Sequence, residues 1–267
     1  MFLIIKSVYS KNRITVKRAY PKSLIMQRII SGVGAVFFPV LLYVYLFDGR
    51  VSKEFYLMTG TNDYISFITL GVAINILSFS TLMNVGRCLI TEIREGTLDT
   101  FLLSPASRIG YFIGCYVEQF MRSIFEFIAV ILFGVILGAR FNLNFDFVIT
   151  TFLASLSFFS VAIFLSTIMV TTRDTYISQN TIFAIMTLIC GVLFPIDYLP
   201  RYLQLLAQVF PLTHAITLMR NSIILQHDLM SNLDIMANLL YTSIPFLIIG
   251  YLAYRRYEKK LVENVFA

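Results

Sequence analysis

The sequence of 267 residues has no tryptophan, two histidines and three cysteines, and charged residues make up only 13% of it. Soluble domains carry a larger share of charged residues, about 25%. At the same time, 58% of the residues are hydrophobic and the mean hydropathy is +0.79. A soluble fold of this size has too little charge to cover so much apolar surface, whereas lipid solvates it. We therefore expect one membrane domain over residues 1–267.

Motifs of the common hydrolases are absent as well. The chain has no G-x-x-x-x-G-K-[ST] phosphate loop, no H-E-x-x-H pair and no G-x-S-x-G elbow. The cysteines, Cys88, Cys115 and Cys190, have no metal-ligand spacing and suit small buried positions. We therefore expect no catalytic residue, no cofactor and no metal in this chain, and no hydrolysis of ATP by the chain alone.

Six apolar runs are long enough to cross a bilayer, which takes about 20 residues in a helix. No signal-peptidase site follows the first run, so we expect the mature protein to keep it. A further apolar stretch, residues 200–225, is interrupted by Pro200 and Pro211 and predicts short re-entrant or interfacial helices. The predicted spans are about 28–47, 64–86, 112–138, 146–170, 177–196 and 236–254.

Basic residues are divided unequally between the two sides of these spans. With the N-terminus inside, fifteen Lys and Arg fall in inner segments and five in outer ones, while Arg122 lies within a span. Cytosolic loops carry the excess of Lys and Arg, so both termini should be cytosolic, as an even number of spans also requires. The net charge of +6 then indicates the membrane surface and not nucleic acid. We expect a multi-pass protein of the cell (plasma) membrane.

The first 22 residues predict an amphipathic helix that lies on the inner leaflet. At about 100° per residue, the apolar side chains fall on one stripe and the basic ones elsewhere. Pro21 separates this helix from the first span. A basic tail without fixed structure is the alternative. The stripe consists of Phe2, Ile5, Val8, Tyr9, Val16, Ala19 and Tyr20.

The inner loop after the second span, residues 91–108, combines mixed charge, an apolar patch and a Pro-Ala-Ser stop. Such a segment predicts a short helix that docks into a groove of a cytosolic partner. Gly96 marks a bend in it. A plain solvated loop is the alternative reading.

Three charged residues, Glu118, Arg122 and Glu126, lie within the third span at positions i, i+4 and i+8. Residues at this spacing share a helix face. Because a charge near mid-membrane costs about 2.5–3.5 kcal/mol, these side chains should face the bundle, with Arg122 between the two carboxylates. The set predicts either a gate on the cargo path or a salt bridge that fixes helix packing. A proton-coupled pump is a third reading.

The outer segment after the fifth span is broken by three prolines. A short helix there, with Leu199, Tyr202, Leu203 and Leu206 on one stripe, could enter the outer leaflet. Its expected role is to seal the outer side or to line an exit. A lone histidine such as His214 most simply caps a helix end. The candidate residues are Pro195, Pro200, Pro211, His214 and Arg220.

The segments at the two sides of the membrane also resemble those of a known family, the ABC type-2 transporter permeases. The outer signature is Cys190 and Val192, Leu199-Pro200, ten residues, Pro211-Leu212-Thr213-His214, five residues and Arg220, and Phe183 departs from it. The inner loop is similar to the family's segment at Glu92, Arg94, Glu95, Gly96, Thr97, Leu98, Ser104, Pro105, Ser107 and Arg108. The basic ending, Tyr254 to Leu261, is similar as well.

This resemblance implies an all-α integral membrane fold. It would have six transmembrane helices, an N-terminal amphipathic connecting helix over residues 1–22, a cytosolic coupling helix and short re-entrant outer helices. Two such permeases, identical or similar, would pair with two separate ATP-binding-cassette ATPase subunits that bind ATP and Mg²⁺. The coupling residues would be Glu92, Arg94, Glu95, Gly96, Thr97 and Leu98.

The resemblance also implies export through the space between the two permeases. Pro-Leu-Thr-His followed by Arg is closer to drug and antibiotic exporters than to glycan exporters, which predicts an amphipathic small molecule, antibiotic, peptide or lipid as cargo. The alternative in the same class is a permease for a polysaccharide or a lipid-linked glycan. The alternative from another class is a secondary transporter driven by protons through Glu118 and Glu126.

Overall fold

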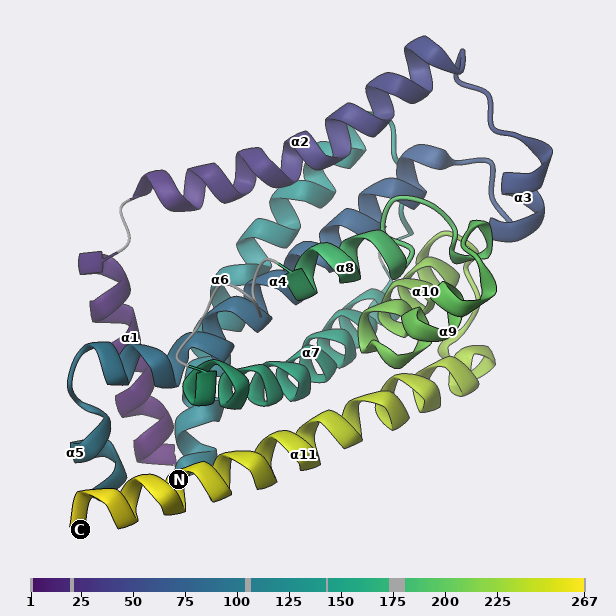
Figure 1. The fold of residues 1–267 in the computed structure, drawn as a ribbon. Coiled ribbons are helices and arrows are strands. Elements are labelled where there is room, and N and C mark those ends of the chain that lie inside the picture. Colours follow the sequence, from purple (N-terminus) through teal and green to yellow (C-terminus); the bar gives the residue numbers. More distant parts are fainter. Residues whose placement is uncertain (1, 20–21, 104–106, 143, 173–180, 267) are drawn as a thin grey trace.

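The computed structural model describes residues 2–19, 22–103, 107–142, 144–172 and 181–266 (Figure 1). Throughout these ranges the secondary structure is helical, with no strand. The helices are α1 (Phe2–Ala19), α2 (Lys22–Leu46), α3 (Lys53–Thr59), α4 (Tyr64–Arg94), α5 (Leu98–Leu103), α6 (Arg108–Ile136), α7 (Phe145–Thr172), α8 (Ile182–Ile189), α9 (Arg201–Val209), α10 (Pro211–Ile223) and α11 (Leu233–Phe266), with 3-10 turns at Ile196–Tyr198 and Leu229–Asn232.

Five helices of the described chain, α2, α4, α6, α7 and α11, are long and apolar enough to cross a membrane. They coincide with five of the six predicted spans. The remaining prediction, 177–196, lies partly outside the described residues. Its described part contains α8, a helix of 8 residues, followed by a turn. A sixth span therefore stays a prediction.

Helix α4 lies at the centre of the bundle and packs against α2, α6, α7 and α10. In its most apolar window 83% of the residues are buried, against 17% in α2 and in α11. Hydroxyl residues occur in this core because they bond to their own helix: Thr69 donates to the carbonyl of Ile65 and Thr81 to that of Leu77. The apolar outer faces of α2 and α11 are left for lipid or a partner chain.

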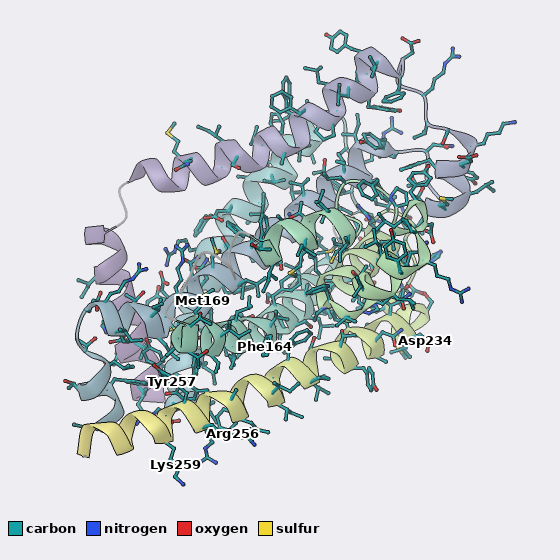
Figure 2. The ribbon with its side chains drawn as sticks, in the orientation of Figure 1. Phe164, Met169, Asp234, Arg256, Tyr257 and Lys259 are labelled. Carbon is teal, nitrogen blue, oxygen red and sulfur yellow. The ribbon has the colours of Figure 1, made fainter. Side chains whose placement is uncertain are left out.

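The bundle has two distinct ends (Figure 1). At one end lie α1, α5, both ends of the chain and the last turns of α11, and we call it the inner end, after the predicted orientation. At the opposite, outer end lie α3, α9 and α10. Charges on α11 follow the same division, since Asp234 lies near its outer end and Arg256 and Lys259 near its inner end (Figure 2).

At the inner end, helix α1 packs against α6. Val8, a member of the predicted apolar stripe, faces Gly114 of α6, where an added Cβ would lie 2.8 Å from the Cβ of Val8 and 3.3 Å from the backbone oxygen of Ile5. This part of the stripe therefore contacts protein. Contact of α1 with the lipid surface remains a prediction.

Candidate functional site

Glu92 is the centre of a polar cluster at the inner end. The residue is 4% exposed, and its carboxylate accepts hydrogen bonds from three directions. Lys11 of α1 donates from Nζ at 2.5 Å, the Tyr111 hydroxyl of α6 donates at 3.0 Å, and the Thr97 hydroxyl donates to the second oxygen. A buried carboxylate needs such partners, since an unpaired one is costly. Glu92 thus joins α1, α4, α6 and the start of α5.

The turn between α4 and α5 is a Schellman cap. Gly96 has φ +68°, its N–H donates to the Ile93 carbonyl at 3.1 Å, and the Thr97 N–H donates to the Glu92 carbonyl at 2.9 Å. Glycine suits this position because it adopts positive φ at little cost. The bend predicted at Gly96 ends α4 and directs α5 across the inner end. Helix α4 consequently continues to Arg94, beyond the predicted span 64–86.

Arg108, the first residue of α6, fixes the other end of α5. Its Nη1 donates to the Phe101 carbonyl at 2.9 Å, and its guanidinium lies 4.7 Å from the centroid of the Phe101 ring. Its Nε donates to Glu258 of α11 at 2.6 Å. The Phe101 ring in turn lies against Tyr111, 4.5 Å between centroids. Through these contacts α5 is held to α6 and, by way of Arg108, to α11.

The predicted coupling residues therefore divide into two groups. Glu92 is buried, and Thr97 and Leu98 are partly buried, so they hold the turn together. Arg94, Glu95 and Gly96 are exposed, as is Leu103, which is 59% exposed on α5. The second group is the more accessible to a partner, although Glu95 also lies 3.8 Å from the Lys11 Nζ.

The charged residues of α6 contact two different neighbours. The Arg122 Nη2 lies 2.5 and 2.6 Å from the two carboxylate oxygens of Glu118, and both side chains are largely buried. Glu126 is 2% exposed and accepts a hydrogen bond of 2.6 Å from Ser80 of α4. Gln119, 1% exposed, lies on the same buried side of α6. The carboxylate of Glu126 is thus enclosed by this chain.

Arg220 of α10 makes hydrogen bonds at the outer end, to the turn that follows α8. Its guanidinium donates to the carbonyls of Gly191 at 2.8 Å, Val192 at 3.1 Å and Phe67 at 3.0 Å, and lies 3.4 Å from the centroid of the Phe67 ring. Gly191 and Val192 lie in the turn after α8, where no helix supplies donors for their carbonyls, and a buried carbonyl without a donor is costly. Gly71 of α4 makes room, since an added Cβ would lie 2.2 Å from the Val192 carbonyl oxygen.

The Pro-Leu-Thr-His segment makes a second such corner, between α9 and α10. Pro211 is the first residue of α10, where its missing N–H costs nothing. Thr213 donates to the Ala207 carbonyl at 2.6 Å, and His214 donates from Nε2 to the Gln208 carbonyl at 3.0 Å. His214 therefore caps the end of α9. The breaks predicted at the prolines are present, since Pro195 and Pro200 directly precede the 3-10 turn and α9.

Three residues that matter at these sites were not singled out from the sequence. They are Lys11, Tyr111 and Phe67, the partners of Glu92 and Arg220. Lys11 is one of several basic residues near the N-terminus, and nothing local distinguishes it. Tyr111 follows Arg108 by three residues, which was the only available signal, since it places both side chains on one face of α6.

The long apolar helices define a multi-pass, all-helical membrane protein with a short docked helix at one end and broken helices at the other. Residues 3–224 match the family described as ABC-2 type transporter. The daunorubicin resistance ABC transporter permease protein DrrB1 of Streptomyces coeruleorubidus is 24% identical over 185 residues, which are 68% of this chain and 63% of that protein. The matched part thus spans less than two thirds of that relative. The chain belongs to the ABC-2 type transporter family, which confirms the family predicted from the sequence.

Proposed function

We propose that this chain is the permease subunit of an ATP-driven exporter and that a separate ATP-binding-cassette subunit hydrolyses ATP. The observation that carries the proposal is the Glu92 cluster, which ties α5 to α1, α4 and α6. Family membership and the absence of a phosphate loop support it. ATP and Mg²⁺ would be bound by the partner and not by this chain.

Coupling would run from α5 into the spans. The exposed Arg94, Glu95 and Leu103 offer two charges and an apolar side chain to a groove on the ATPase. Closure of two ATPases would displace α5, and the Phe101–Tyr111 contact would pass that displacement to α6. Packed elements of this kind move as rigid bodies between discrete arrangements.

The outer corners would keep the exit closed until the spans move. Arg220 joins α4, the end of α8 and α10, so a relative shift of these helices has to break several hydrogen bonds together. Two permeases, identical or similar, would enclose the path. The cargo would be an amphipathic small molecule, antibiotic, peptide or lipid, and daunorubicin is a suitable probe because the relative is a daunorubicin resistance permease.

Charge reversal on the exposed part of the α4–α5 turn tests the coupling. The variant Arg94→Glu/Glu95→Lys should lose the ATPase in a purification from mild detergent, whereas the unmodified chain should retain it and its ATP hydrolysis. The matched control is Lys53→Glu/Glu54→Lys, which reverses two exposed charges on α3 at the outer end. If both variants retain the ATPase equally, the α4–α5 turn does not dock on the ATPase.

The energy source of transport distinguishes an ATP-driven exporter from a proton-coupled transporter. Cells that carry the chain and its ATPase should accumulate less daunorubicin than cells without them. Depletion of ATP should abolish the difference, whereas an uncoupler applied at constant ATP should not. The opposite result would favour a proton-driven transporter that uses Glu118 and Glu126.

A further inference from the structure

A cavity of about 270 Å³ lies at the inner end of the bundle, between the start of α6 and the last turns of α11. It is separate from the exposed face of α5 that we propose for the ATPase. The α6 side contributes Ser107 and Arg108, and the α11 side contributes Tyr254, Arg255 and Glu258.

Positive charge dominates around this cavity. Helix α6 is 29 residues long and begins here with Ser107 as its N-cap, so the positive end of its dipole faces the cavity. Arg108 and Arg255 add two positive charges. Glu258 supplies one negative charge, which lies 2.6 Å from Arg108. The balance favours an anion.

The two arginines differ in availability. Arg108 is engaged within the protein by Glu258 and by the Phe101 carbonyl. Arg255 is exposed, and its guanidinium lies 5.6 Å from the centroid of the Tyr251 ring. Among the side chains that the structure describes, up to Lys259 in α11, no carboxylate lies within ion-pair distance of Arg255. Arg255 is therefore the cation that an external anion can pair with.

Tyr254 provides an independent sign of a missing ligand. The residue is 2% exposed, and its ring packs edge-on against Phe112, 5.3 Å between centroids. Its hydroxyl has no hydrogen-bond partner among the described residues, although the residue lines the cavity. Buried polar groups almost always have a partner, and a phosphate oxygen would serve as one.

The position of the cavity indicates where that phosphate comes from. On α11, Ile244 and Ile248, each 52% exposed, lie on the same helical stripe as Arg255, and the charged residues of the helix begin with Arg255 after this apolar stretch. Apolar residues followed by Tyr and Arg mark the level of the lipid headgroups. We infer that this cavity binds the phosphate of an anionic phospholipid of the inner leaflet, with its acyl chains along α11.

Arg255 and Tyr254 would hold the headgroup, and the N-terminus of α6 would add its dipole. A basic pocket between helices on the cytosolic side is a recurrent arrangement for anionic lipids. A bound lipid would lie between α6 and α11, beside the Arg108–Glu258 pair that connects them.

Native mass spectrometry of the full-length chain, purified in mild detergent, tests the proposal with phosphatidylglycerol and phosphatidylcholine. Arg255→Gln should weaken phosphatidylglycerol binding about fivefold, the contribution of one basic residue near an anionic surface. Tyr254→Phe keeps the ring against Phe112, removes only the hydroxyl, and should weaken binding as well. Phosphatidylcholine should bind less than phosphatidylglycerol to the wild type.

The matched control is Arg256→Gln, which removes the same charge from a neighbouring residue that lines a different groove, between α7 and α11. Binding by this variant should equal that of the wild type. If Arg255→Gln and Arg256→Gln weaken phosphatidylglycerol binding equally, the lipid is attracted by the basic end of α11 in general and not by this cavity. That result would overturn the proposal. Displacement of the lipid by millimolar inorganic phosphate, with equal binding of both lipids, would also overturn it, in favour of a soluble phosphate.

Discussion

The side chains of Lys11 and Glu92 form an ion pair, with 2.5 Å between Nζ and Oε1, that joins positions 81 residues apart in the chain. The pair links the N-terminal helix to the turn that carries α5. The Lys11 side chain is 43% exposed, whereas the Glu92 side chain is 6% exposed. Without its partner the ammonium group can still be hydrated, whereas the buried carboxylate would lose a charged hydrogen-bond donor that water cannot replace.

Lys11→Met should therefore destabilise the inner end. It leaves a buried carboxylate with hydroxyl donors alone, and the loss of a hydrogen bond to a charged group costs about 1.5–3 kcal/mol. Thermal unfolding in mild detergent measures the loss. Glu92→Gln on its own should also destabilise, and the double variant should lose less than the sum of the two, because contacting residues are not independent. Strictly additive losses would show that the pair contributes nothing.

Gly71→Ala should lower the amount of folded protein. The new Cβ would lie 2.2 Å from the Val192 carbonyl oxygen and 2.6 Å from Arg220 Nη2, so either the end of α8 or the arginine has to move. Gly34→Ala is the control, because Gly34 lies in α2 and no atom lies within 4 Å of its added Cβ. That control should be neutral or slightly stabilising, by about 0.5–1 kcal/mol. Membrane abundance and thermal unfolding compare the two variants, and equal behaviour would contradict the close approach of α4 to the outer corner.

Arg220→Met should open the outer corner. The carbonyl groups of Gly191 and Val192 lose their donor, and buried unpaired groups cost about 1–3 kcal/mol each. Arg220→Lys should rescue little, since an ammonium lacks the planar fork that reaches several acceptors. Labelling of a cysteine introduced at Val192 by a membrane-impermeant reagent reports the opening, because Val192 is 1% exposed in the closed corner. Arg201→Met, an exposed residue of α9, is the control and should leave the labelling slow.

The spans and the broken outer helices could be predicted because both follow from local composition. A run of about 20 apolar residues is visible without any knowledge of neighbours, and proline limits a helix wherever it occurs. The length of α4 was harder to predict. Hydropathy detects the edge of the lipid near residue 86, whereas the helix ends only at the Schellman cap around Gly96.

The partners of the charged residues could not be predicted in the same way. A helical wheel places Glu118, Arg122 and Glu126 near one face, but eight residues rotate by about 80° relative to complete turns. That rotation is enough to bring Glu126 to Ser80 of α4 while Glu118 pairs with Arg122. Likewise, the sequence identifies Arg220 but not the carbonyls that it binds, because these belong to α4 and to the end of α8.

The charges of α6 allow a last prediction that separates packing from proton transfer. Arg122→Ala leaves Glu118 without the guanidinium nitrogen that lies 2.5 and 2.6 Å from its two carboxylate oxygens, so membrane abundance or transport should fall. The isosteric Glu126→Gln keeps an acceptor for the Ser80 hydroxyl and removes only the titratable group. If Glu126 serves packing, this variant should retain abundance and ATP-dependent efflux within about twofold, because an uncharged amide is cheaper to bury than a carboxylate. Efflux abolished at normal abundance would instead assign Glu126 to proton movement, and the choice between these outcomes requires only membrane blots and an efflux assay on the same cells.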